Sequence, residues 1–211
     1  MKSSVRLVWC GVIAALGLAT GCSSEQQPLS EKYPTQWKTC DALFGAKNMD
    51  ALRDILGPDD LEFTNRPLSV EKIRKGLTEE ALEPYDEIEG FDEYDVCWLS
   101  GGSQFRSDVA WAAASLKEVQ SSSGRWKRVG PDLYVANSAG TIDLVFRCEV
   151  RGASNGQQAQ VLLEARVSDV GSPEFSQTFH EELAVRLARA VRDEVACTNE
   201  PVIPDDLAIR E

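Results

Sequence analysis

Nine carboxylates fall between Glu79 and Asp95, a stretch that contains no lysine or arginine. Hard oxygen ligands suit calcium, and an exported protein meets that ion at concentrations that fill weak sites. The spacing matches no EF-hand loop, and a run of like charges is typical of a solvated surface. We therefore predict no metal site and keep calcium binding as an alternative. The nine residues are Glu79, Glu80, Glu83, Asp86, Glu87, Glu89, Asp92, Glu93 and Asp95.

The string Ser69-Val70-Glu71-Lys72 matches the SxxK pattern, in which a lysine activates a serine nucleophile in penicillin-interacting enzymes. The SDN and KTG strings that complete such a site are absent, and the chain is short for that fold. Leu68 precedes Ser69, and apolar residues at helical spacing follow it. We therefore interpret Ser69 as the N-cap of a helix.

The sequence Arg125-Trp126-Lys127-Arg128 is the one basic cluster of an otherwise acidic mature chain. Basic residues around an aromatic ring could contact anionic lipid or a cell-wall polymer. The simpler interpretation is a hairpin whose basic side chains are solvated while Trp126 packs inward. We favour the hairpin.

His180 is the only histidine, which excludes catalytic or metal schemes that need two imidazoles. We expect it on the surface of the last helix and assign it no role. No GxSxG, P-loop, GxGxxG or HExxH string occurs, so we predict no catalytic residue and no cofactor. Paired carboxylates for hydrolysis remain an alternative, because 34 acidic residues guarantee pairs that only geometry can select.

Four cysteines remain once Cys10 and Cys22 are set aside: Cys40, Cys97, Cys148 and Cys197. In an oxidising compartment an even number without CxxC spacing indicates two disulfides. Four cysteines allow three connectivities. We favour Cys40 with Cys97 and Cys148 with Cys197, since each pair would join a helix to a strand nearby in the chain.

The N-terminus has the pattern of an export signal. Residues 1–21 carry Lys2 and Arg6, no acid, and an apolar run that is too short to span a bilayer. Ala19-Thr20-Gly21-Cys22 then resembles a bacterial lipobox, which implies a diacylglycerol on Cys22. Ordinary signal peptidase cleavage at the same bond is the alternative, because Ala19 and Gly21 are small.

Length and charge set further limits. The 211 residues fit one domain, and 43% hydrophobic residues suffice to close one core. Removal of residues 1–21 leaves 20 basic against 34 acidic residues, so we expect no nucleic-acid partner. We assign residues 1–21 to a signal peptide, 22–35 to a lipidated tether, 36–198 to a single domain and 199–211 to a flexible tail.

Apolar periodicity predicts helices first and strands afterwards. Helical spacing recurs near residues 37–44, after a cap at Asn48, and after Ser69. The period then changes to two, which predicts strands near 94–99, 105–113, 133–136, 141–150 and 160–168. Short turns between them favour antiparallel pairing.

A long amphipathic helix closes the chain. We expect it to be capped by Ser172, to include Phe175 and to end near Cys197. The predicted fold class is α+β: an antiparallel sheet with short N-terminal helices and a long C-terminal helix packed on it.

With these elements the chain resembles the small exported actinobacterial lipoproteins of unknown function with paired cysteines. The residues that carry the resemblance are the lipobox-like Ala19-Thr20-Gly21-Cys22, Trp37-Lys38-Thr39-Cys40, Phe146-Arg147-Cys148-Glu149-Val150 and Val195-Ala196-Cys197. The resemblance covers most of residues 1–200, and it implies location and fold more than activity.

We therefore expect a non-catalytic protein, lipid-anchored on the extracytoplasmic side of the cell membrane, that binds a protein partner or a small ligand. The alternatives are an envelope hydrolase with paired carboxylates and an accessory structural lipoprotein of a membrane complex.

Overall fold

The computed structural model describes residues 27–57, 61–64, 68–83, 91–154, 156, 160–171, 175–207 and 209. The expected signal peptide and Cys22 lie outside these residues, as do Asp86, Glu87 and Glu89 of the acidic stretch. Within the described residues no helix is long and apolar enough to cross a membrane.

Short helices open the fold: α1 (Leu29–Lys32), α2 (Pro34–Phe44), α3 (Ala46–Leu56) and α4 (Val70–Leu82). Gly45, with a φ of +84°, separates α2 from α3 and is the N-cap of α3. The prediction that Asn48 caps this helix is wrong, because the chain already turns at the left-handed glycine. Asn48 lies inside α3 and donates its side-chain amide to the Phe44 carbonyl. Ser69 caps α4 as predicted and accepts the Lys72 amide.

The seven strands of the described residues form one antiparallel sheet, in the order β1-β2-β3-β7-β6-β5-β4. After β3 the chain forms the short helix α5 (Leu116–Ser121) and the meander β4-β5-β6, and β7 then returns to pair with both β6 and β3. The strands are β1 (Glu62–Phe63), β2 (Tyr94–Ser100), β3 (Gln104–Ser115), β4 (Lys127–Gly130), β5 (Leu133–Ser138), β6 (Thr141–Arg147) and β7 (Val161–Val170).

The closing helix α7 (Gln177–Val195) is the longest of the described helices. It begins later than predicted: Ser176 is its N-cap and accepts the Phe179 amide, and Phe175 precedes the helix. The expected cap, Ser172, lies outside the described residues. Leu183, Leu187 and Val191 recur on the buried side of α7, as the four-residue spacing predicts.

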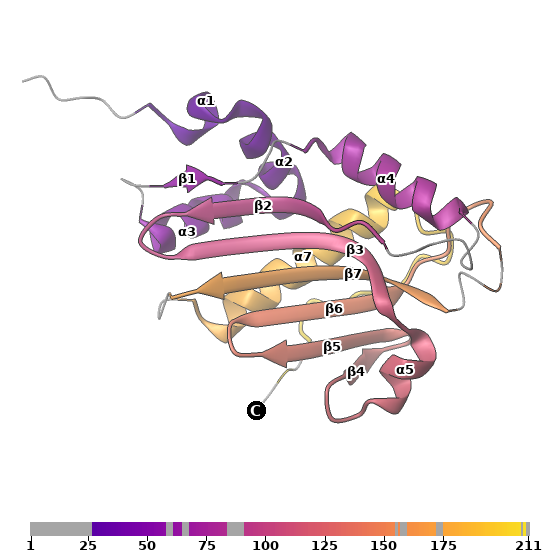
Figure 1. Ribbon diagram of the computed structural model, residues 1–211. Helices are drawn as coiled ribbons and strands as arrows, with labels where there is room; N and C mark the ends of the chain where they lie inside the picture. Colours follow the sequence, from indigo (N-terminus) through magenta and orange to yellow (C-terminus); the bar gives the residue numbers. More distant parts are fainter. Residues whose placement is uncertain are drawn as a thin grey trace, which may run out of the picture.

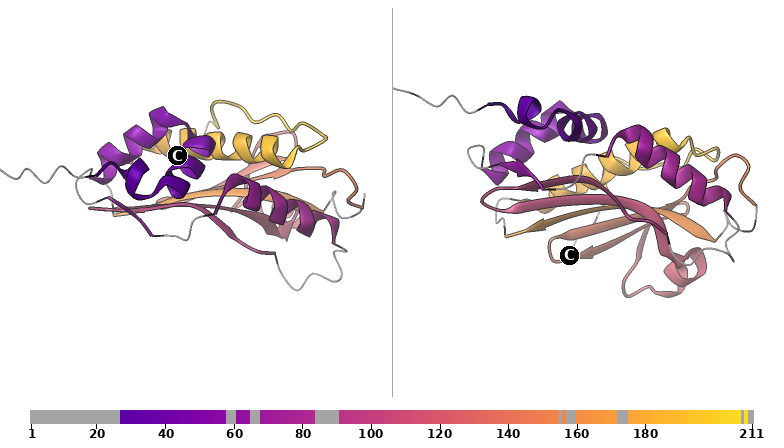
Figure 2. Two further views of the ribbon diagram at one scale, coloured as in Figure 1. Left: turned by 90° about the horizontal axis from the view of Figure 1, so that it is seen from above. Right: turned by 45° about the horizontal axis from the view of Figure 1, so that its top comes forward.

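The helices and the sheet form two layers. Helices α2, α3 and α7 lie against one face of the sheet, which we call the inner face, and the opposite outer face is turned to the viewer in Figure 1. Figure 2 shows the same two layers with the sheet edge-on. The main core lies between the layers and includes Leu43, Leu77, Phe105 and Leu187. The α+β fold class predicted from the sequence is confirmed.

The segment after Thr198 packs on the domain. We expected a flexible tail here, yet Ile203 and Leu207 are buried in the core. Arg189 of α7 donates from Nε to the Ile203 carbonyl at 3.0 Å, and Arg192 donates to the Pro201 carbonyl at 3.1 Å. Helix α7 ends at the left-handed Ala196, and these arginines hold the chain that follows against the helix.

Candidate functional site

A row of charged residues crosses four strands of the outer face. Asp95 of β2 is paired with Asp108 of β3, Asp108 with Arg166 of β7, and Arg166 with Asp143 of β6. Side chains alternate between the two faces of a strand, and Phe105 and Val109 of β3 point into the main core. Asp108 and its neighbours in the row therefore share the outer face.

Arg166 is the centre of this row. Its Nε lies 2.7 Å from Asp143 Oδ1, and its two terminal nitrogens lie 2.6 Å from Glu164 Oε1 and 3.3 Å from Asp108 Oδ1. A fourth carboxylate, that of Glu93, lies 3.6 Å away. One guanidinium thus contacts four carboxyl groups.

Arg106 extends the cluster toward the edge of the sheet. It donates from Nε to Asp95 Oδ1 at 3.0 Å, pairs with Glu93, and lies over the Trp98 ring at 5.3 Å from the ring centre. Trp98 is half-buried. We call this set the charge network; its members are Glu93, Asp95, Asp108, Asp143, Glu164, Arg106 and Arg166.

Burial shifts the pKa values of the network. Asp108 is only 2% exposed, and burial, opposed by Arg166, raises the pKa of its carboxyl to about 7. Burial also raises the pKa of Glu164, again against Arg166. Burial alone would lower the pKa of Arg166, but its hydrogen bond to Asp143 and the surrounding carboxylates raise it. Arg166 therefore stays charged, while Asp108 titrates near neutral pH.

A second, smaller core covers the other half of the outer face. Val119 of α5 and Trp126 pack there on Tyr134, Val145 and Leu162 of the sheet. Ser115 and Glu118 form a capping box at the start of α5. Figure 1 shows α5 in front of the sheet at that end.

The basic cluster belongs to this smaller core. Trp126 is 7% exposed and packs inward, as the hairpin interpretation predicted. Arg125 lies over the Trp126 ring at 5.2 Å, and its guanidinium lies 3.9 Å from Asp143. Arg128 donates to the Gly130 carbonyl. The cluster thus adjoins the charge network.

The acidic stretch divides between the two faces. Glu93 and Asp95 belong to the charge network. Glu80 of α4 accepts the Tyr94 hydroxyl at 2.6 Å, and Glu79 pairs with Lys75 along α4. Among the residues that the structure describes, no three histidine, cysteine or acidic side chains are grouped to hold a metal ion.

His180 is buried, so the expectation of a surface histidine is wrong. It is 5% exposed, its Nε2 lies 3.0 Å from Asp169 Oδ1, and the Phe175 ring lies 4.9 Å from its ring. That close contact lacks hydrogen-bond geometry at Nε2. Burial lowers the pKa of His180, and Asp169 opposes the shift. The Phe175 ring packs against His180, and helical periodicity alone does not tell whether His180 is buried or exposed.

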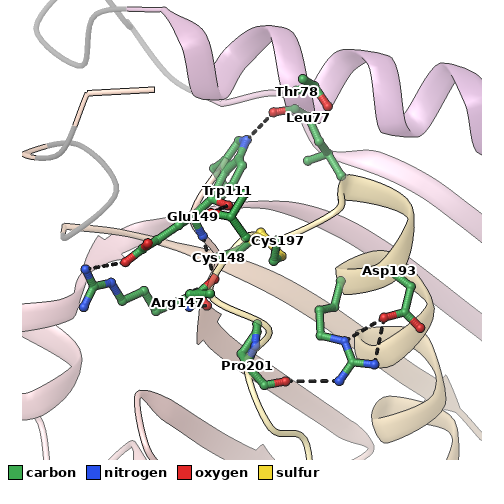
Figure 3. Close-up of a disulfide and its surroundings, with 12 residues drawn as sticks. Leu77, Thr78, Trp111, Arg147, Cys148, Glu149, Asp193, Cys197 and Pro201 are labelled. Carbon is green, nitrogen blue, oxygen red and sulfur yellow. Dashed lines mark hydrogen bonds and ion pairs between the residues drawn. A yellow bond between two sulfur atoms is a disulfide. The ribbon is translucent and has the colours of Figure 1, made fainter. Parts of the chain in front are cut away.

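The structure forms both disulfides of the connectivity we favoured, Cys40–Cys97 and Cys148–Cys197. The first joins α2 to β2 inside the main core, where both sulfurs are buried. The second joins the end of β6 to the end of α7 (Figure 3). Beside it Asn199 accepts the Glu149 amide and donates to the Arg147 carbonyl, which fixes the chain after α7.

Two surface hollows lie along α7, away from the charge network. The larger, about 850 Å³, lies beside the Cys148–Cys197 disulfide and is lined by Arg151, Arg189 and Arg192 among others. The smaller, about 500 Å³, shares Arg189. Arg189 pairs with Asp205 and Arg192 donates to the Pro201 carbonyl, so these guanidiniums hold the C-terminal segment against α7.

Sequence reasoning missed the charge network. The available signal was the charged residues at alternate positions of strands that are otherwise apolar, notably Asp143 in Thr141–Phe146 and Arg166 in Val161–Val167. Charged residues at alternate positions indicate only a solvent-facing side of a strand, and strand order is needed to tell whether they contact one another.

Comparison with known proteins adds no assignment: no protein family, curated protein or solved structure significantly matches this chain.

Proposed function

We propose that this protein is exported, anchored through a diacylglycerol on Cys22, and binds a protein partner outside the cell membrane without catalysing a reaction. One observation carries the proposal: no described helix or strand covers the half of the outer sheet face that bears the charge network. We call this surface the open half; besides the network it carries Trp98, Gln104 and Ser168.

The open half has the composition of a protein interface. Tryptophan and arginine are enriched at binding hot spots, and here Arg106 and Trp98 contact one another. The ion pairs already fix the arginine side chains, so binding would freeze little additional side-chain freedom. A sheet face with fixed polar groups fits a partner surface better than a small molecule, which usually requires a concave pocket.

Two features support an extracytoplasmic location. Disulfides persist in oxidising compartments, and this domain has two. The N-terminal sequence carries the charged start, the apolar run and the lipobox-like residues that end at Cys22. A bacterial lipoprotein carries two or three acyl chains, enough for stable anchoring.

The hydrolase alternative has one observation in its favour. Asp108 and Glu164 are two carboxyls with raised pKa values on one surface, as acid catalysis requires. Both contact Arg166, however, and neither lines the two hollows along α7. Their arrangement on a sheet face favours binding over catalysis.

Site-specific photo-crosslinking in living cells tests the proposal. A photoreactive residue replaces Gln104, which is exposed on the open half, and a matched control replaces Lys75, which is exposed on α4. Each is made with Cys22 intact and with Cys22→Ala, and captured proteins are identified by mass spectrometry.

We expect one protein to be captured from Gln104, not from Lys75, and only when Cys22 is present. Equal capture from both positions would show that the open half is not the interface. Capture that persists with Cys22→Ala would overturn the anchored form of the proposal.

A further inference from the structure

The charge network contains more negative than positive groups. Five carboxyls face two guanidiniums, so the fully ionised network carries three uncompensated negative charges. Arg125 is a further cation, whose guanidinium lies 3.9 Å from Asp143 and whose side chain is 67% exposed; counting it still leaves two more negative than positive groups. The whole chain is acidic as well, with a net charge of −12. The open half is therefore complementary to a cationic surface.

Asp108 is the carboxyl that this imbalance affects most. Its side chain is 3% exposed, and its contact with Arg166 at 3.3 Å is longer than those of Asp143 and Glu164. The ionisable groups that face it are Glu93 and Asp95 at β2, Arg106 on its own strand, Glu164 and Arg166 on β7, and Asp143 on β6.

Two kinds of positive charge can relieve the imbalance at Asp108. One is a proton on its own carboxyl, which burial favours because a neutral acid is easier to bury. The other is an ammonium or guanidinium group placed on the open half by a partner, which favours the ionised carboxylate. Both act on the same network, so they compete.

We propose that the open half docks a segment of the partner protein that carries lysine or arginine, and that docking displaces a proton from Asp108. This rests on the function proposed above and names the chemistry of the partner. The proton passes from the Asp108 carboxyl to solvent, and the cation of the partner takes its place in the charge balance.

The pH dependence of docking follows from this competition. The carboxyl of Asp108 has a pKa of about 7 when the face is free. If it is ionised in the complex, affinity should be about tenfold higher at pH 8 than at pH 6, since about nine-tenths of the free protein must lose a proton at pH 6.

Isothermal titration of the full chain with a defined probe tests this. The probe is a decapeptide rich in lysine and arginine, with a glutamine-substituted decapeptide as its control. Titrations at pH 6, 7 and 8, in buffers of different ionisation enthalpy, give the dissociation constant and the number of protons released. The variant is Asp108→Asn, and the matched control is Asp54→Asn on the exposed side of α3.

We expect wild type and Asp54→Asn to bind about tenfold more tightly at pH 8 than at pH 6 and to release up to about one proton. Asp108→Asn should bind the peptide with no pH dependence from this site and without releasing a proton. His180 is present in all three proteins and is buried on the inner face, so its titration contributes no difference in pH dependence between them. If Asp108→Asn keeps the pH dependence, the proton linkage is wrong.

A second pair of variants tests whether the peptide binds at this face. Asp143→Asn/Glu164→Gln removes two charges from the network, and Asp50→Asn/Asp54→Asn removes two from α3. We expect the first to weaken binding more than about tenfold and the second less than about twofold. Equal weakening would overturn docking at the open half. Failure of the linkage alone leaves the crosslinking test of the proposed function unaffected.

Discussion

Replacement of Asp108 by asparagine should change how stability depends on pH. The carboxyl is 2% exposed in the folded protein and has a pKa of about 7 there; in the unfolded chain an aspartate has a pKa of about 3.9. Between these values the folded state binds the proton and the unfolded state does not. The stabilisation from this site is therefore complete below about pH 4 and is lost as the pH rises through 7.

The size of the effect follows from the two pKa values. Between pH 5 and pH 8 the wild type should lose about 2.5 kcal/mol of unfolding free energy at this one site. Asparagine has almost the same shape and cannot ionise, so Asp108→Asn should not show this loss. Other titrating groups, including His180, are common to both proteins and cancel in the difference.

Urea unfolding followed by tryptophan fluorescence, with the disulfides intact, measures the difference. The free energy of unfolding is determined at pH 5, 6, 7 and 8 for wild type, Asp108→Asn and the exposed control Asp54→Asn. We expect the free energy of unfolding of Asp54→Asn to change with pH as that of wild type does. The free energy of unfolding of Asp108→Asn should rise relative to both as the pH rises. Parallel curves for all three proteins would refute the argument that Asp108 is buried at a charge deficit.

Three further predictions concern single features of the fold. Burial lowers the pKa of His180, so the folded protein resists its protonation and wild type should lose stability below about pH 6.5. His180→Phe should not show this loss in urea unfolding. Cys148→Ser/Cys197→Ser should cost about 4 kcal/mol, measured by urea unfolding, since the disulfide joins cysteines that are 49 positions apart in the chain. Trp126→Ala should cost about 3 to 5 kcal/mol by the same assay, because the ring fills the smaller core.

Each of these three has an outcome that contradicts it. A His180→Phe curve parallel to wild type would mean that the histidine is not held neutral. A disulfide variant as stable as wild type would mean that the unfolded chain is not constrained by the bond. A Trp126→Ala variant with unchanged stability would mean that the indole does not pack in the smaller core.

The sequence alone predicted the larger helices and strands and their order, but not α1, β1 or α5. The change from helical spacing to a period of two separated the N-terminal helices from the strands, and the four-residue repeat of Leu183, Leu187 and Val191 identified α7. Ser69 could be identified as a cap because capping is local. The disulfide pairing could be favoured because each pair joins a helix to a strand and uses cysteines that are consecutive among the four in the chain.

Local patterns failed where contacts between distant residues decide the outcome. Asn48 has the right side chain for a cap, but Gly45 turns the chain first. His180 lies beside charged Glu181, yet it is buried and contacts Phe175 and Asp169. Ile203 lies between two prolines, yet Arg189 holds its carbonyl.

The charge network is the plainest case of a feature that only the tertiary structure decided. Alternation predicts, for each strand separately, that Asp108, Arg166 and Asp143 lie on the side opposite the main core. The three strands are far apart in the sequence. The return of β7 between β3 and β6 sets the register that places all three in one row. A sequence specifies which residues alternate along a strand, but strand order and register determine which charges meet and how deeply they are buried.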